Sequence, residues 1–218
     1  MQDQTALVIH ATTDIGAAIA LALADAGAKV MLNYLDERDK AEKLAEHIRD
    51  QQGQAMIFRA DVDQEKEVIS MLDVLKVYWG RMDILVNSAG LHDNTNLKLA
   101  SQFLRVRQEA RELLGRRVNI RPADEVGKII CISNSGIHSK GSLGIFLDVL
   151  TRKLSEDTVR VNAIWSENGN PSAAQDGNAY AIAQMAAWLV SDAAETCNGE
   201  TINIAYETTV AKAWRINN

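Results

Sequence analysis

The chain has 218 residues, of which 47% are hydrophobic and 24% are charged, and its formal net charge is -6. This length suits one domain with a sizeable core, and the acidic balance argues against binding to nucleic acid or to an anionic membrane. The apolar runs are too short to span a membrane and the first residues lack the basic start of a signal peptide, so we expect a cytoplasmic protein.

Short apolar runs rich in β-branched residues alternate along the chain with longer stretches of helical period. Strands are predicted at Thr5–His10, Lys29–Asn33, Gln54–Ala60, Asp83–Asn87, Gly127–Ser133, Val159–Ile164 and Thr201–Ile204. Helices are predicted at Asp14–Ala26, Glu37–Gln51, Asp63–Tyr78, Leu99–Leu114, about Ser139–Leu154 and Ala179–Val190. A polar loop is predicted at Ser166–Asn178.

The strands are nearly continuous apolar runs, which is typical of a parallel sheet with helices on both faces. Regular alternation of strand and helix with right-handed crossovers predicts an α/β fold, a doubly wound parallel sheet of about seven strands. No linker divides the sequence, so residues 1–218 are predicted to form a single domain. Cys131 and Cys197 lack zinc or redox spacing, which predicts two buried thiols and no metal site.

Six segments, in chain order, resemble the short-chain dehydrogenase/reductase family. They are 6–32 (ALVIHATTDIGAAIALALADAGAKVML), 61–62 (DV), 87–90 (NSAG), 127–133 (GKIICIS), 160–164 (RVNAI) and 189–204 (LVSDAAETCNGETINI). The resemblance covers nearly the whole chain. It implies a Rossmann-type fold, a nicotinamide cofactor and usually a tetramer.

The family's turn after the first strand resembles Thr-Gly-x-x-x-Gly-Ile-Gly, whose glycines admit the cofactor's diphosphate to a helix N-terminus. Here His10 and Asp14 stand at the first two glycine positions and only Gly16 remains. Two unit charges about 4 Å apart repel by roughly 4 kcal/mol at a dielectric constant near 20, which weakens binding on the order of a thousandfold. Two roles are open for Asp14. In the first alternative it is the N-cap of the helix and its carboxylate replaces the phosphate, and in the second the cofactor binds in an altered pose.

The resemblance assigns four further positions to the adenosine side of a cofactor: Thr12, Asp61, Asn87 and Ile164. Asn33 and Tyr34 follow the second strand without an acid that would bind a ribose 2′-hydroxyl, which leaves NAD or NADP open. We expect cofactor binding to be lost in this chain, and NAD or NADP to be bound by an active partner.

Catalysis in the family resembles a relay of a tyrosine, a lysine four residues later, a serine and an asparagine. The alignment places the lysine at Lys140, but the tyrosine position falls on Gly136 and the serine position on Asn134, while Asn96 matches the asparagine. No tyrosine of the chain is followed by a lysine at the fourth place: these residues are Tyr34, Tyr78, Tyr180 and Tyr206. We therefore predict that no catalytic set is intact.

Two other side chains near these positions have alternative interpretations. His138 could act as a substitute acid–base group, but it lies two residues before Lys140, and residues two apart do not share a helix face. Trp165 stands where the family has Pro-Gly, and it either fills the space of a nicotinamide or packs in the core.

The helices predicted at 99–114 and 139–154 resemble the bundle that joins subunits in the family. In the second, Leu147, Leu150 and Leu154 belong to one apolar stripe, and Val149 adds apolar surface on the opposite side. A helix that is apolar on two sides is buried twice, once on its own sheet and once elsewhere, although both sides could also lie in the domain's own core.

Three hypotheses for function follow. The first is a catalytically inactive subunit that pairs with a homologous active dehydrogenase/reductase subunit, in an α2β2 tetramer. The second is an NAD(P)-dependent oxidoreductase with a rearranged site that uses Lys140, His138 or a serine beside Asn134. The third is a non-catalytic ligand sensor or scaffold.

Overall fold

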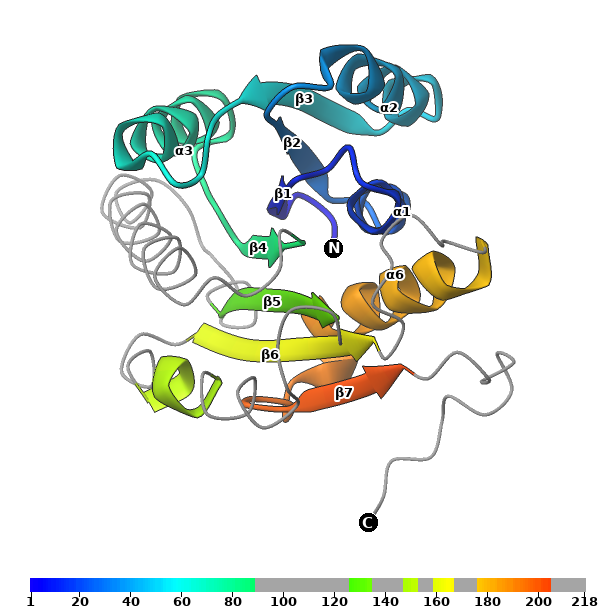
Figure 1. Ribbon diagram of the computed structural model, residues 1–218, viewed down its shortest axis with the longest axis vertical. Helices are drawn as coiled ribbons and strands as arrows, with labels where there is room; N and C mark the ends of the chain where they lie inside the picture. The colour runs from blue at the N-terminus through cyan, green and yellow to red at the C-terminus, as the bar shows by residue number, and fades with distance from the viewer. Residues whose placement is uncertain (89–125, 135–146, 153–158, 167–175, 205–218) are drawn as a thin grey trace.

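A computed structural model describes residues 1–88, 126–134, 147–152, 159–166 and 176–204 (Figure 1). These residues form one seven-stranded sheet with the order β3-β2-β1-β4-β5-β6-β7, in which every neighbouring pair is parallel. The strands are β1 (Thr5–Ile9), β2 (Lys29–Tyr34), β3 (Gln54–Arg59), β4 (Ile84–Asn87), β5 (Gly127–Asn134), β6 (Val159–Ser166) and β7 (Thr201–Ile204). The predicted doubly wound α/β sheet is thereby confirmed.

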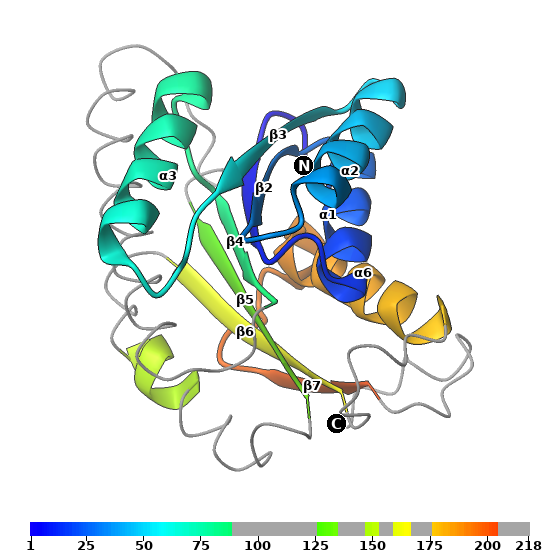
Figure 2. The same cartoon turned by 45° about the horizontal axis from the view of Figure 1, so that its top comes forward.

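Helices cover both faces of the sheet (Figure 2). They are α1 (Asp14–Asp25), α2 (Arg38–Asp50), α3 (Glu65–Trp79) and α6 (Asp176–Val190), with the short 3-10 helix η2 (Asp192–Ala194) after α6. Helices α1, α2 and α6 pack on one face, whereas α3 and a helical segment at 147–152 pack on the other. None of the helices in the described ranges is long and apolar enough to cross a membrane.

The sheet has a hydrophobic core on each of its two faces, and alternate side chains of a strand belong to one core or the other. In β1, Leu7 and Ile9 belong to the core under α3, while Ala6 and Val8 belong to the core under α1 and α6. This agrees with the two-sided burial that the continuous apolar runs predict, since successive residues of a strand point to opposite faces. All five residues of β1 are buried.

A buried charged group ties the beginnings of two strands together. The Asp83 carboxylate accepts a hydrogen bond from the backbone N–H of Thr5 at 2.8 Å and another from the Nε–H of Arg81 at 2.7 Å. Because the side chain of Asp83 is only 4% exposed, its charge depends on these partners. This contact fixes β1 against β4 at the edge of the sheet where the strands begin.

The observed elements differ from the predicted ones mainly at their ends. The first strand stops at Ile9 because His10 turns into the left-handed region, with φ 53°. β6 continues through Trp165 and Ser166, and α6 begins at Asp176, so both elements extend into the segment that was predicted as a polar loop. The predicted helix at 99–114 and most of the one at 139–154 lie outside the described residues.

Candidate functional site

The turn after β1 lies at the carboxyl ends of the strands, the edge where open parallel sheets bind ligands. His10 occupies the first glycine position with φ 53°, a conformation that favours glycine. Its carbonyl oxygen accepts the backbone N–H of Thr13 at 3.2 Å and the Thr13 hydroxyl at 3.0 Å. The turn thus keeps a left-handed conformation with a histidine in place of glycine, and it is closed by its own hydrogen bonds.

Asn33 holds this turn against the ends of two other strands. Its side-chain oxygen accepts the N–H of His10 at 3.2 Å, and its amide nitrogen donates to the carbonyl of Ala60 at 3.0 Å. The Ser88 hydroxyl adds a bond from the end of β4 to the carbonyl of Ile9, at 2.5 Å. The sequence predicts Asn33 as the last residue of the second strand and assigns its side chain no role. Its side chain is buried within β2, which continues to Tyr34, and a lone amide in an apolar strand was the signal of this role.

The N-cap of α1 is Thr13, so the alternative that Asp14 caps the helix is wrong. The Thr13 hydroxyl accepts the N–H of Gly16 at 3.1 Å, and Thr13 has the extended backbone of an N-cap. Asp14 is the first residue of the helix and is exposed to solvent. Its carboxylate stands in the first turn, where a helix attracts anions.

Gly16 is required by packing at this turn. A Cβ at this position would overlap the carbonyl oxygen of His10 and would lie 2.9 Å from Thr13 Oγ1. The third glycine of such turns allows close packing of helix on strand. Its presence therefore has a structural reason that does not depend on a cofactor.

A charged cluster connects the turn to the start of α2. The Lys40 ammonium lies 2.5 Å from a Glu37 carboxylate oxygen. Hydrogen bonds from Lys40 and then from the Thr12 hydroxyl lower the pKa of the Glu37 carboxyl, and Glu37 raises the pKa of Lys40. Asp14 contributes a weaker attraction to Lys40. A shallow hollow of about 230 Å³ lies over residues 36–40. Glu37 comes three residues after β2 and was missed from sequence, because only the residues directly after the predicted strand were considered as an acid position.

The other adenosine-side positions come to the same edge of the sheet. Asn87 ends β4 and is paired in register with Ile9 of β1, while Ile164 lies near the end of β6 with a fully buried side chain. Asp61 follows β3, where its carboxylate accepts the N–H of Asp63 at 3.0 Å and shapes the turn before α3. The predicted positions are thus brought together at the carboxyl edge of the sheet.

Of the four predicted catalytic positions, only Asn134 lies in the described residues, as the last residue of β5. Asn96, Gly136 and Lys140 lie outside them, as does His138. Beside Asn134, the Ser133 hydroxyl is buried and has no hydrogen-bond partner among the described residues. Trp165, paired in register with Ser133, is 5% exposed and belongs to the core under α3, in agreement with the core-packing alternative.

The two thiols differ in their environments. Cys131 is buried, and burial raises the pKa of its thiol to about 12. Cys197 is only partly buried, so the prediction of two buried thiols was wrong for this residue. Within the described ranges, no three or more His, Cys, Asp or Glu side chains are arranged to hold a metal ion.

The parallel sheet, its covering helices and the turn after β1 define a doubly wound α/β protein of the Rossmann type. The family pattern described as short chain dehydrogenase matches residues 4–111. A short-chain dehydrogenase/reductase of Pestalotiopsis microspora is 30% identical over 180 residues, which cover 75% of this chain and 68% of that relative. The chain belongs to the short-chain dehydrogenase/reductase family, a family of oxidoreductases.

Two further similarities extend over nearly the whole chain. An uncharacterized oxidoreductase of Methylorubrum extorquens is 28% identical over 239 residues, which cover 93% of this chain and 96% of the relative. The crystal structure of a short chain dehydrogenase from Burkholderia cenocepacia in complex with NADP matches with a TM-score of 0.69 at 22% identity, over 94% of this chain and 97% of that one. The latter likeness supports the fold.

Proposed function

We propose that this chain is a non-catalytic member of its family that pairs with an active short-chain dehydrogenase/reductase subunit in a cytoplasmic α2β2 complex. The observation that carries the proposal is the turn after β1. Side chains stand there where the family has glycines, and one of them, Asp14, brings an exposed carboxylate to the helix N-terminus. The residues of this turn do not fit a dinucleotide diphosphate.

The exposure of Asp14 sets the size of the electrostatic penalty. Two unit charges 4 Å apart repel by roughly 1 kcal/mol in water and roughly 4 kcal/mol at a dielectric constant near 20. An exposed carboxylate belongs between these limits, which corresponds to a loss of affinity between about fivefold and a thousandfold. Lys40 offsets part of this repulsion through its attraction to Asp14. The thousandfold loss of cofactor affinity expected from sequence is therefore the upper limit of this range.

The sequence around Lys140 supports the absence of turnover. Gly136 offers no hydroxyl one helical turn before the lysine, and each tyrosine of the chain lacks a lysine four residues later. Within the described residues, the nearby thiol of Cys131 is buried and stays protonated at neutral pH, because its pKa is raised to about 12. This thiol therefore does not supply the proton that the missing phenol would transfer.

The helical segment at 147–152 supports a partner surface. Leu147 and Leu150 are each 1% exposed and belong to the core under α3. Val149 points away from that core and is 44% exposed. One side of this helix is thus buried on its own sheet, and its other side offers apolar surface to a neighbouring subunit.

Titration of the purified chain with NADH and NADPH, followed by fluorescence, tests the loss of cofactor binding. We expect no saturation below about 1 mM, and a gain of at least about fivefold in affinity for Asp14→Asn, because this change removes only the charge. The matched control is Asp39→Asn, which removes an exposed charge in the first turn of α2. Micromolar binding by the unchanged chain would overturn this part of the proposal.

Mixing the chain with an active homologue from the same source tests the pairing. We expect a co-eluting complex with higher activity or thermal stability than the active subunit alone, and we expect Val149→Lys to weaken it. The control Val77→Lys changes a valine of α3 that is 79% exposed. A complex that is equally sensitive to both changes, or the absence of any complex, would refute the assigned surface.

A second candidate, an NAD(P)-dependent oxidoreductase with a rearranged site, is favoured by one observation. His10 keeps the left-handed conformation of the turn, so its backbone shape is that of a glycine turn although its side chains differ. This candidate predicts ketone reduction or alcohol oxidation by the chain alone, lost in Lys140→Ala. The non-catalytic proposal predicts no such turnover.

A further inference from the structure

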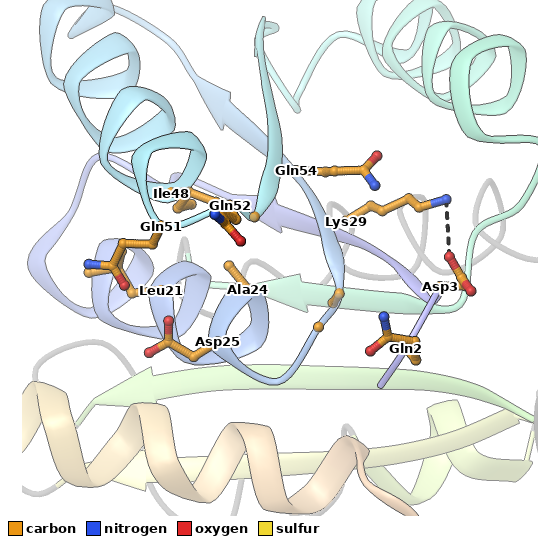
Figure 3. A pocket seen from close by; sticks show the side chains of 13 residues that line it. Gln2, Asp3, Leu21, Ala24, Asp25, Lys29, Ile48, Gln51, Gln52 and Gln54 are labelled. Atoms are coloured by element: carbon orange, nitrogen blue, oxygen red, sulfur yellow. Dashed lines mark ion pairs between the residues drawn. The ribbon is translucent and has the colours of Figure 1, made fainter.

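The strand β3 lies at one end of the sheet, and among the residues that the structure describes no strand pairs with its outer edge. In Figure 1, β2 lies on one side of β3, and the other side forms the top of the sheet, between α2 and α3. At the beginning of the strand, the exposed side chain of Gln54 stands at the rim of a hollow (Figure 3), so this end is open to solvent as well. An open edge of this kind can pair with a further strand.

The hydrogen bonds of β3 indicate which of its backbone groups face outward. In a parallel pair, alternate residues of a strand direct both their N–H and their C=O toward the same neighbour. The N–H of Ala60 donates to the Tyr34 carbonyl of β2, so the even-numbered residues of β3 face β2. The odd-numbered residues therefore face outward, and they are Ala55, Ile57 and Arg59. In agreement, the Ala55 carbonyl accepts a hydrogen bond at 3.3 Å from the exposed guanidinium of Arg49.

The middle of β3 lacks the features that usually keep an open edge from pairing. Proteins protect such edges with proline, with a bulge or with charged side chains. Residues 55–58 (AMIF) are all apolar, and their register with β2 is continuous. Met56 and Phe58 pack on the core under α3, whereas Ala55 and Ile57 pack on the core under α1 and α6, and each of the four is only partly buried. Apolar surface is therefore left at this edge on both faces of the sheet.

We propose that β3 pairs in antiparallel orientation with β3 of a second copy of this chain, about a two-fold axis at Ile57. The outward-facing residues are centred on Ile57. The axis therefore places Ile57 opposite its own copy and Ala55 opposite Arg59 of the second copy. In an antiparallel ladder, such pairs exchange both of their N–H···O bonds, so all the outward-facing backbone groups of both strands are paired. The two sheets then form one continuous sheet.

The side chains of β3 fit this register. On the face of α3, Met56 lies opposite Phe58 of the second copy, and a thioether beside an aromatic ring is a favourable contact. Arg59 lies opposite an alanine, and Glu67 of its own chain is 3.8 Å away. No like charges within residues 54–59 are therefore opposite each other, whereas an axis at Arg59 would oppose two guanidinium groups. The strand is thus complementary to itself, which favours a second copy as the partner.

This pairing does not depend on the function proposed above, because it uses a different part of the molecule. The helical segment at 147–152 lies near the other end of the sheet, where Thr151 is close to Gly199, just before β7. The chain can therefore contact a copy of itself through β3 while the helical segment faces a different subunit.

Sedimentation velocity of the purified full chain over a range of concentrations tests the pairing. We expect a monomer–dimer equilibrium. Arg59→Pro should raise its dissociation constant at least about fivefold, because by symmetry it removes a backbone hydrogen bond at each end of the paired strands. Proline is tolerated at an edge position whose N–H faces outward, so this variant should fold. The matched control Arg59→Ala keeps the N–H and should change the dissociation constant by less than about twofold.

A disulfide at residue 57 tests the register. Opposite residues of a hydrogen-bonded antiparallel pair have Cα atoms about 5.5 Å apart, which a disulfide can span. In a chain that also carries Cys197→Ser, we expect mild oxidation to join two copies through Ile57→Cys, as seen on a non-reducing gel. Val77→Cys in the same background is the control, and it should not form this dimer although Val77 is 79% exposed.

Three results would each overturn the proposal: a chain that stays monomeric at every concentration, equal dissociation constants for Arg59→Pro and Arg59→Ala, or equal cross-linking through residues 57 and 77. Val149→Lys separates this pairing from one through the helical segment at 147–152. We expect the β3 dimer to withstand this change. A dimer that Val149→Lys abolishes and Arg59→Pro leaves intact would also refute the assignment to β3.

Discussion

The replacement Gly16→Ala measures how tightly α1 packs on the turn after β1. The added Cβ would overlap the His10 carbonyl oxygen and would come within 2.9 Å of Thr13 Oγ1. Both of these are parts of the turn, and the Thr13 hydroxyl is also the acceptor that caps α1. Neither can move without loss of a hydrogen bond, so we expect a substantial decrease in stability.

The expected size follows from three contributions. Overpacking of a tight contact costs about 1–3 kcal/mol, and loss of the N-cap bond costs about 1 kcal/mol. Alanine in a helix regains about 1 kcal/mol relative to glycine. The net loss is about 1–3 kcal/mol, and for a domain of this size each kcal/mol lowers Tm by about 2–4 °C.

Urea and thermal unfolding of the purified chain, without nicotinamide, give the measurement. The control is Gly80→Ala, where φ is 71° but no atom lies within 4 Å of the added Cβ, so only a backbone cost of about 1–2 kcal/mol is expected. If Gly16→Ala unfolds at the same urea concentration as the unchanged chain, the packing argument for Gly16 is refuted.

Two further predictions concern other buried groups. Asp83→Ala should lower the free energy of unfolding by about 3–5 kcal/mol, because it leaves the Arg81 guanidinium and the Thr5 N–H without their carboxylate. A loss below about 1 kcal/mol in urea unfolding would contradict this. In the folded chain at pH 8, iodoacetamide should modify Cys197 before Cys131, because burial raises the pKa of Cys131 to about 12 and leaves roughly one thiol in ten thousand ionised. Mass spectrometry distinguishes the two sites, and earlier modification of Cys131 would show that its burial is wrongly assigned.

The order of strands and helices could be predicted from sequence because it rests on apolar periodicity, which the described elements follow. β5 and β7 begin at the predicted residues, and β7 also ends where expected. The ends of other elements depend on single backbone angles. Nothing in the residue type of His10 indicates a φ of 53°, so the first strand was predicted one residue too long. Thr13 and Asp14 are both good N-cap residues, and only the backbone conformation chooses between them.

The candidate site was predictable in its position but less so in its contacts. Motifs at the ends of separate strands must meet at one edge of a parallel sheet, which brought Thr12, Asp61 and Asn87 together. The link from Thr12 to Glu37 joins two separate loops, and sequence spacing carries no information on which side chains meet there. The extension of β6 through Trp165 follows from an apolar residue in place of Pro-Gly, which allows pairing to continue beside β5.

The bonds made by the amide of Asn33 have a consequence for how this family member can change. These hydrogen bonds join the ends of β1, β2 and β3, and they hold the backbone at the carboxyl edge of the sheet in place. The shape of the edge is therefore independent of the charges displayed on it. Substitutions at surface positions such as Asp14 can alter which ligands bind at the carboxyl edge of the sheet without disturbing the hydrogen bonds of Asn33.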